Sequence, residues 1–389
     1  MEIPESYRGR EQAYVKHQLL RAYLERLFMI IGQFQSRIRY VDCFSGPWHE
    51  TEKDLQDTSI GISLDIMKKC REGLSKMGHD VTFKALFIEK DKNAYEKLNE
   101  HLKEYASIGV ETDAQNGEFF NLRDAILQWC GSKDFTFFFI DPTGWKHVIE
   151  LPTLEPFLKR PNSEFLVNFM YDFLVRTHTQ ESFKDDMRSI FGYTPDTDGM
   201  EPKQRETYLL KLYRDNLKQI VPSWGGVPRT AQVPILYPLR DRTLYHLVYL
   251  TRHAKGIAVF MTASEKLDLI QKRVRSQAKQ ENREFRSKQL EMFQSYDQVQ
   301  TKENVDLEKV KIYWLSRLSL QPQEFGIEQL ADMLEEKGWF ESDLQTAIGE
   351  LIAEGKVANL NDETKRRRKK YIHFDANYNK GEFLIRIES

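Results

Sequence analysis

The chain contains few cysteines, three among 389 residues. Each lies in or beside an apolar run, and their spacing matches neither a disulfide framework nor a zinc site. They are Cys43, Cys70 and Cys130. Such low cysteine usage is typical of proteins that fold in a reducing compartment, so we expect a cytoplasmic protein that binds no metal.

Long apolar runs, a large net charge and several enzyme motifs are also absent. No run approaches the roughly 18–20 apolar residues of a membrane span, and the N-terminus lacks a signal-peptide pattern, so we expect no membrane contact. The formal net charge is −2, so any attraction to nucleic acid must come from local clusters. The absence of Walker, G-x-S-x-G and H-E-x-x-H motifs argues against P-loop NTPases, α/β-hydrolases and zincins.

Helical and strand-like segments alternate through the first part of the chain. Residues 10–31 have apolar side chains at helical spacing, and strand-like apolar runs follow at 38–44, 81–91, 135–140 and 164–173. This alternation predicts a doubly wound, Rossmann-like α/β sheet with mostly parallel strands.

The later segments differ in composition. Residues 176–232 are polar and predict a helical insertion, and 243–263 predict two strands that turn at Ala254–Gly256, an antiparallel edge hairpin. Further on, two short amphipathic helices precede a hairpin, the outline of a winged helix. The predicted domains are residues 1–263, a charged linker helix at 264–303 and a winged-helix domain at 304–389.

Two strand-like runs end at an aspartate that opens a turn. Asp42 precedes Ser45-Gly46-Pro47, and Asp141 precedes Pro142-Thr143-Gly144. Ligands of open α/β sheets bind at the carboxyl ends of the strands. The first turn has one glycine and lacks the G-x-G-x-x-G fingerprint, so it fits S-adenosylmethionine, which has no pyrophosphate, better than a dinucleotide. An ordinary strand-ending turn is the alternative.

Acidic residues near the next two strand ends extend the predicted cofactor site. Glu89 is placed to accept hydrogen bonds from ribose hydroxyls, although it follows Asp42 by 47 residues, well above the roughly 20 of a compact unit. Glu118, or else Asp113, is expected to meet the adenine, while a helix N-terminal role is the alternative for Glu118. The predicted cofactor contacts are Asp42, Phe44, Ser45, Gly46, Glu89, Glu118 and Asp113.

The second aspartate turn is the predicted catalytic segment. Asp141 and the Pro142 carbonyl are expected to accept hydrogen bonds from a substrate amine and so orient its lone pair, and Trp145 is expected to stack on a planar base. The alternative is a plain type I turn, which favours Asp, Pro and Gly at these positions.

Two basic segments are candidates for phosphate contact. Between residues 272 and 288 there are seven Lys and Arg against two Glu, and six consecutive cations stand at the expected wing tip. The candidates are Lys272, Arg273, Arg275, Lys365, Arg366, Arg367, Arg368, Lys369 and Lys370. A solvated linker helix is the alternative for the first segment, and a protein-binding winged helix for the second.

As an ordered set, these motifs resemble class I, Rossmann-like S-adenosylmethionine-dependent methyltransferases and, more narrowly, the three-Cys-motif partner protein family. The matching pieces are KHQLLRAYLERL (16–27), YVDCFSGPW (40–48), ALFIEKD (85–91), NGEFF (116–120), FFFIDPTGW (137–145), EFLVNF (164–169) and YHLVYLTRHAKGIAVFM (245–261). The resemblance implies a methyltransferase-like fold, S-adenosylmethionine as cofactor and a separate partner protein with a three-cysteine motif.

Two departures from the family pattern bear on activity. Trp48 stands where the family usually has a second glycine, and the D-P-T-G turn differs from the D-P-P-[YF] of base amino-methyltransferases. Our main hypothesis remains a methyltransferase acting on DNA or RNA, and the departures motivate an alternative. The alternative is a methyltransferase-fold module that binds nucleic acid and a partner protein without transferring a methyl group.

Overall fold

The computed structural model divides into two compact units, residues 1–252 and 253–389. It describes residues 3–46, 57–105, 109–142, 144, 148–172, 174, 183–287, 305–361, 371–375 and 380–387. None of the helices described is both long enough and apolar enough to cross a membrane.

The first unit alternates helices and strands. Its elements in chain order are η1 (Glu5–Tyr7), α1 (Glu11–Ile31), β1 (Arg37–Asp42), α2 (Ser59–Lys76), β2 (Thr82–Glu89), α3 (Lys92–Tyr105), β3 (Glu111–Asn116), α4 (Arg123–Cys130), β4 (Phe135–Ile140), α5 (Leu151–Leu158), β5 (Ser163–Phe169), α7 (Phe183–Phe191), α8 (Pro202–Ile220), β6 (Arg229–Leu236) and β7 (Thr243–Thr251). Strands β4 and β5 are buried along their whole lengths, as expected when helices cover both faces of a sheet.

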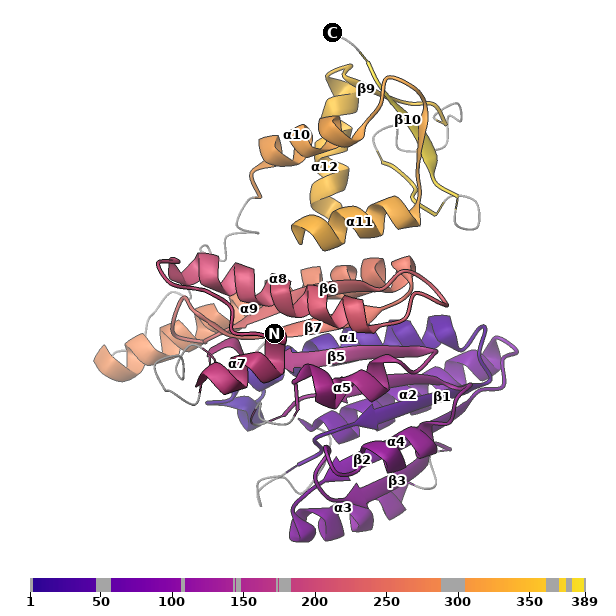
Figure 1. The fold of residues 1–389 in the computed structure, drawn as a ribbon, viewed down its shortest axis with the longest axis vertical. Helices are drawn as coiled ribbons and strands as arrows, with labels where there is room; N and C mark the ends of the chain where they lie inside the picture. Colours follow the sequence, from indigo (N-terminus) through magenta and orange to yellow (C-terminus); the bar gives the residue numbers. More distant parts are fainter. Residues whose placement is uncertain are drawn as a thin grey trace. The chain divides into compact units, whose positions relative to one another are not determined.

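The strands form one seven-stranded sheet in the order β3-β2-β1-β4-β5-β7-β6 (Figure 1). Strands β1 to β5 pair in parallel, while β7 pairs antiparallel with both β5 and β6. The predicted α/β class, mostly parallel sheet and antiparallel edge are therefore confirmed, and they are consistent with a Rossmann-like methyltransferase fold. Strand order reverses between β1 and β4, which is the switch point where such sheets bind ligands.

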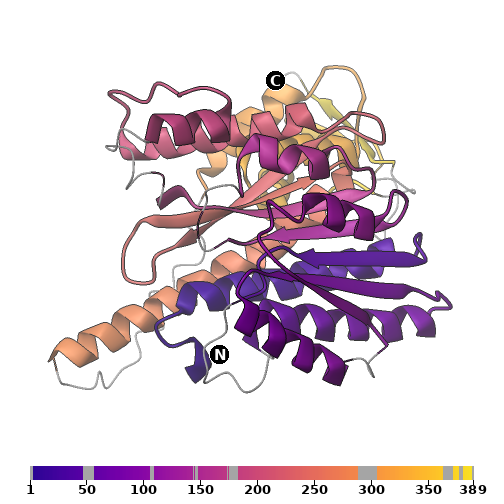
Figure 2. The same ribbon diagram turned by 60° about the horizontal axis from the view of Figure 1, so that its bottom comes forward.

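Helices cover both faces of the sheet (Figures 1 and 2). On one face, α1 packs against the strands through aromatic side chains: the Tyr23 ring lies 5.1 Å from Tyr249 and 5.9 Å from Phe137. The other face is an apolar core in which α4, α5, α7 and α8 meet the strands. Successive side chains of a strand point to opposite faces, so neighbouring residues at a strand end lie on opposite sides of the sheet.

The antiparallel edge combines one strand in the predicted segment with another strand from outside it. Residues 243–263 do not form two strands that turn at Ala254–Gly256. Strand β7 ends at Thr251, and helix α9 (Ala254–Ser287) begins at the predicted turn. The hairpin partner of β7 is β6, whose first residues fall within the segment predicted as a helical insertion. A short apolar run fits a strand or a helix equally well, and here it continues into a long amphipathic pattern, so the helix forms.

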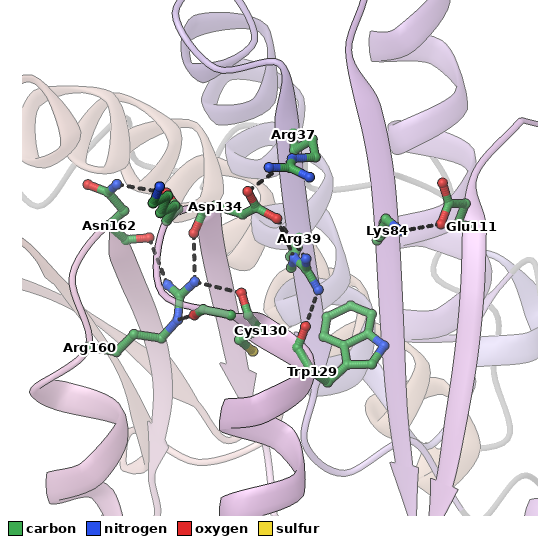
Figure 3. Close-up of polar contacts among 11 residues, drawn as sticks. Arg37, Arg39, Lys84, Glu111, Trp129, Cys130, Asp134, Arg160 and Asn162 are labelled. Carbon is green, nitrogen blue, oxygen red and sulfur yellow. Dashed lines mark hydrogen bonds and ion pairs between the residues drawn. The ribbon is translucent and has the colours of Figure 1, made fainter.

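A polar network holds the amino ends of the central strands (Figure 3). Arg37 and Arg39 on β1 both reach Asp134, at 3.1 and 2.7 Å, just before β4. The Arg160 guanidinium is buried and donates to the carbonyl oxygens of Cys130 at 2.9 Å and Asp134 at 2.7 Å. Intramolecular hydrogen bonds and ion pairs therefore join the strands at this edge, which lies opposite the switch-point edge.

The second unit contains α9, α10 (Leu307–Arg317), β8 (Gln323–Phe325), α11 (Ile327–Lys337), α12 (Glu341–Ala353), β9 (Val357–Asn359) and β10 (Glu382–Arg386). Its strands form an antiparallel sheet in the order β8-β10-β9. Trp314 is fully buried and donates its indole N–H to the Leu344 carbonyl oxygen at 3.0 Å, which joins α10 to α12. Ser342 at the start of α12 donates to Glu265 of α9 at 2.6 Å.

Candidate active site

Two aspartates stand at the switch point. Asp42 is the last residue of β1, and Asp141 directly follows the last residue of β4. The two strands pair in parallel, with Asp42 opposite Phe139. The two strand ends that the sequence singled out are therefore neighbours in space, where strand order reverses.

Asp42 presents a carboxylate of fixed orientation. The residue is fully buried, Ser59 Oγ donates to Oδ2 at 2.7 Å, and the Phe44 N–H donates to Oδ1 at 3.1 Å. Burial raises the pKa of Asp42 to about 6, and the two hydrogen bonds partly oppose that rise. A buried carboxylate with a raised pKa beside a ligand-binding edge is typical of functional sites.

The turn after β1 presses against the end of β2. The Ser45 N–H donates to the Ile88 carbonyl oxygen at 2.9 Å, and Ser45 Oγ donates to the Asp42 carbonyl oxygen at 3.1 Å. A Cβ on Gly46 would lie 2.1 Å from Glu89 Oε2. A side chain at position 46 would therefore displace the Glu89 carboxylate, and the predicted residues Ser45, Gly46 and Glu89 meet in one place.

Glu89 is oriented by backbone next to it. The Asp91 N–H donates to Glu89 Oε1 at 2.7 Å, and burial raises the pKa of the Glu89 carboxyl. Asn116, opposite Glu89 in the β2–β3 register, donates its side-chain N–H to the Glu89 carbonyl oxygen at 2.9 Å. The ends of β2 and β3 are thereby joined.

The two candidates for the adenine contact lie at different distances from the carboxyl end of β3. Glu118 lies two residues beyond the end of the strand, and its side chain is exposed. Asp113 is also exposed, but it lies opposite Leu86, three positions before the strand end. Glu118 is therefore at the ligand-binding edge, whereas Asp113 is set back from it.

Aromatic side chains lie near the same edge. The partly buried Phe44 ring lies 5.4 Å from the ring of Phe119, which stacks on Phe157 at 5.1 Å. Phe120 is partly exposed, with the Arg123 guanidinium 4.2 Å from its ring centre. This region offers an apolar wall with cationic and acidic groups beside it.

Asp141 is held by two residues that sequence reasoning missed. Lys16 of α1 forms an ion pair and hydrogen bond with Oδ2, and Asn168 of β5 donates its side-chain N–H to Oδ1 at 2.8 Å. Lys16 opens the α1 motif that carried the family resemblance, and its helical spacing from Leu19 and Leu20 places it on the buried side of α1. Its partner lies 125 residues away, so no local pattern signals the contact.

The remaining predicted residues are only partly described. Pro142 is buried, while Trp145 and the run Lys365–Lys370 lie outside the described residues. In α9, Lys272 pairs with Asp268 at 2.9 Å, and Arg273 is exposed. Arg275 is partly buried and has contacts of its own. Within the part of the chain that the structure describes, no three His, Cys, Asp or Glu residues form a group that could hold a metal ion.

Comparisons with known proteins do not assign a family. No protein-family model matches the chain, and no curated protein is significantly similar. Among solved structures, the chain is similar to PKMT2 from Rickettsia typhi in complex with AdoHcy, with 9% identity and a TM-score of 0.28. The match covers 61% of this chain and 56% of PKMT2, so the chain spans little more than half of that protein. Because the TM-score is low, the proposals below rest on the geometry of the site.

Proposed function

We propose that the chain is an S-adenosylmethionine-dependent methyltransferase that acts on a base of DNA or RNA. The observation that carries the proposal is the close approach of Gly46 to Glu89 beside the buried Asp42 carboxylate. The two oriented carboxylates can accept hydrogen bonds from an ammonium group and from two ribose hydroxyls, and Gly46 leaves the turn open because it has no side chain.

The described residues fit that cofactor by their chemistry. Asp42 and the backbone of the turn would hold the cationic methionine end, and Glu89 would accept from the ribose hydroxyls. Phe44 would face the adenine ring, and Glu118 would accept from its amine. Asp113 is the weaker candidate because it is set back from the strand end.

Asp141 and Pro142 would position the acceptor, with Trp145 stacking on the base. S-adenosylmethionine supplies a methyl group on a sulfonium, and its transfer forms an N–C bond while the S–C bond electrons stay on sulfur. The protein's own task is to orient the acceptor nitrogen in line with that methyl group. Asp141 is suited to this task because two protein donors fix its carboxylate.

Calorimetric titration of the full chain with S-adenosylmethionine and S-adenosylhomocysteine tests the proposal. We expect micromolar affinity, weakened at least tenfold, or about 1.4 kcal/mol, in Glu89→Ala and Gly46→Ala. Glu111→Ala is the matched control, because it removes an exposed carboxylate at the opposite end of neighbouring β3. Absence of binding by the folded wild type, or equal affinity in all four proteins, contradicts the proposal.

A second candidate is a methyltransferase-fold module that binds nucleic acid without transfer. It is favoured by the full engagement of Asp141, since both carboxylate oxygens already receive protein donors. Incubation with radiolabelled S-adenosylmethionine and with DNA and RNA oligonucleotides separates the two. Label in the nucleic acid supports the enzyme, while oligonucleotide binding without label supports the module.

For the second unit we propose a winged-helix domain that contacts nucleic acid. Its support is the order α10, β8, α11, α12, β9, β10 with β10 between the other two strands. The proposed domain limits remain 1–263, 264–303 and 304–389, although α9 passes residue 263 without a break. Membership of the three-Cys-motif partner family, and a partner protein with that motif, also remain proposals.

A further inference from the structure

Helix α1 places a cation on the proposed acceptor-binding aspartate. The side chains of Lys16 and Asp141 are 15% and 14% exposed, so their ion pair is largely withdrawn from water. Buried pairs of this kind are costly to break, because each partner left alone is a poorly solvated charge. The contact is therefore a permanent part of the site.

The charge of this cluster follows from its members. Lys16 contributes one positive charge, Asp141 one negative charge, and Asn168 none, so the three side chains together are neutral. A cationic acceptor such as a protonated lysine side chain would have to compete with Lys16 for the carboxylate. A neutral amine brings no charge, so it can share the carboxylate oxygens without displacing the Lys16 ammonium.

The orientation of Asn168 adds a specific acceptor. A carboxylate can only accept, so the amide must turn its N–H group toward Asp141. Its Oδ1 atom is then buried and, within the described part of the chain, has no hydrogen-bond partner. An unpaired buried acceptor is unfavourable, and an N–H donor from a ligand would relieve that cost.

We propose that Lys16 is a specificity-determining residue that selects a neutral amine, such as the exocyclic amine of a base, over an ammonium group. The inference rests on the proposed methyltransferase function and names its acceptor class. A neutral amine already has the lone pair that forms the N–C bond, and after the S–C bond breaks its surplus proton passes to solvent. An ammonium must lose a proton first, and both carboxylate oxygens of Asp141 already accept hydrogen bonds from Lys16 and Asn168.

The test compares two acceptors in one assay. The full-length wild type is incubated with radiolabelled S-adenosylmethionine and either adenine- and cytosine-containing oligonucleotides or a lysine-containing peptide. We expect label in the oligonucleotides and at least tenfold less in the peptide. Lys16→Met is expected to lower the oligonucleotide-to-peptide ratio at least tenfold, whereas Lys16→Arg retains it because Arg keeps the cation.

Two controls keep the outcome interpretable. Lys69→Met removes a lysine that pairs with Glu25 on the exposed surface, and its ratio should match the wild type. If Lys16→Met fails to fold, as judged by circular dichroism, Lys16→Gln removes the charge while keeping a polar side chain and should show the same loss of preference.

Three results overturn the inference. They are comparable labelling of peptide and oligonucleotide by the wild type, an unchanged ratio in folded Lys16→Met, and loss of cofactor binding in Lys16→Met, which would place Lys16 on the cofactor side. Failure of the wild type to bind S-adenosylmethionine at all overturns the proposed function, and this inference with it. The cofactor titration of each variant distinguishes that case from the others.

Discussion

Asp42 combines a place at the switch-point edge of the sheet with an energetic cost. Its carboxylate is fully buried, and burial raises its pKa to about 6, with Asp141 adding to the rise and Lys16 opposing it. Folding therefore works against the ionised form of this side chain. A carboxylate kept in such a position serves binding better than it serves stability.

The pH dependence of stability follows from that shift. Asp42 has a higher pKa in the folded state than in the unfolded chain, about 6 against about 4, so the folded state binds more protons in that window. Its contribution to stability is thus lost as pH rises from about 4 to 6. Urea denaturation is expected to show Asp42→Asn more stable than the wild type at pH 7, by on the order of 3 kcal/mol.

The same measurement at lower pH provides the control. The advantage of Asp42→Asn should shrink as pH falls below 6 and disappear below about pH 4, where the wild-type carboxyl becomes protonated in both states. A stability difference that stays constant between pH 4.5 and 8 would contradict the assignment of this pH dependence to Asp42.

The residues that the sequence could predict are those that end apolar strands. Asp42, Glu89 and Asp141 each close a run of buried residues, and parallel strands bring such ends to one edge. Lys16 and Asn168 could not be predicted in the same way. Lys16 lies on the buried side of α1, in line with Leu19, Leu20 and Tyr23, but nothing in the local sequence identifies its partner. Asn168 is a polar residue inside a fully buried strand.

At the level of elements, two secondary-structure predictions, those for β6 and for the start of α9, were wrong for physical reasons. Strand β6 contains Pro234, which argues against a central strand, but proline is tolerated at an edge, and β6 is the last strand of the sheet. The start of α9 is apolar enough to resemble a strand when its later amphipathic turns are ignored. Both decisions depend on which neighbours cover the segment, and the local pattern does not contain that information.

Arg160 joins several elements at the amino edge of the sheet, and among the contacts there its loss should reduce the stability of the fold most. Its guanidinium also donates to the carbonyl oxygens of Gly131 at 2.9 Å and Pro161 at 2.8 Å. Arg160→Met is expected to destabilise the fold by roughly 3–5 kcal/mol, because several buried carbonyl groups lose their donors. The free energy of unfolding in urea measures this.

A matched arginine on the surface tests the cause. Arg188 is 66% exposed and pairs with Asp185 within α7, so Arg188→Met should change stability by less than about 0.5 kcal/mol. Arg160→Lys should recover only part of the loss, since an ammonium cannot match the geometry of five donors. Similar losses in Arg160→Met and Arg188→Met would show that the carbonyl network is unimportant.

At the scale of the whole molecule, charge is unevenly placed in the second unit. Helix α12, which follows α11 as the second helix of the proposed helix–turn–helix, contains acidic residues and no Lys or Arg. Lys311 of α10 is surrounded by Glu308, Glu350 and Glu354. The proposed phosphate contacts are therefore expected from residues outside α12.

The source of the proposed phosphate contacts can be tested by measuring how the affinity for oligonucleotides depends on salt concentration. Replacing Lys365–Lys370 with serine should weaken binding across all sequences and reduce the slope of log K against log salt by about 0.7–0.9 for each lost phosphate contact. Thr346→Ala, an exposed change on α12, should leave both affinity and slope unchanged. A large effect of Thr346→Ala with none from the lysine and arginine run would assign the contact to α12 instead.

The strand order has a consequence for how partners can approach. The two outermost strands are β3, which is polar and carries Glu111 and Asp113 on exposed positions, and β6, which carries Pro234. Charged side chains repel an incoming strand, and proline has no N–H to offer one. The sheet is therefore a poor template for strand addition at either end. Unfolding intermediates that keep the sheet should resist fibril growth, and protein partners are expected to dock on helices or loops.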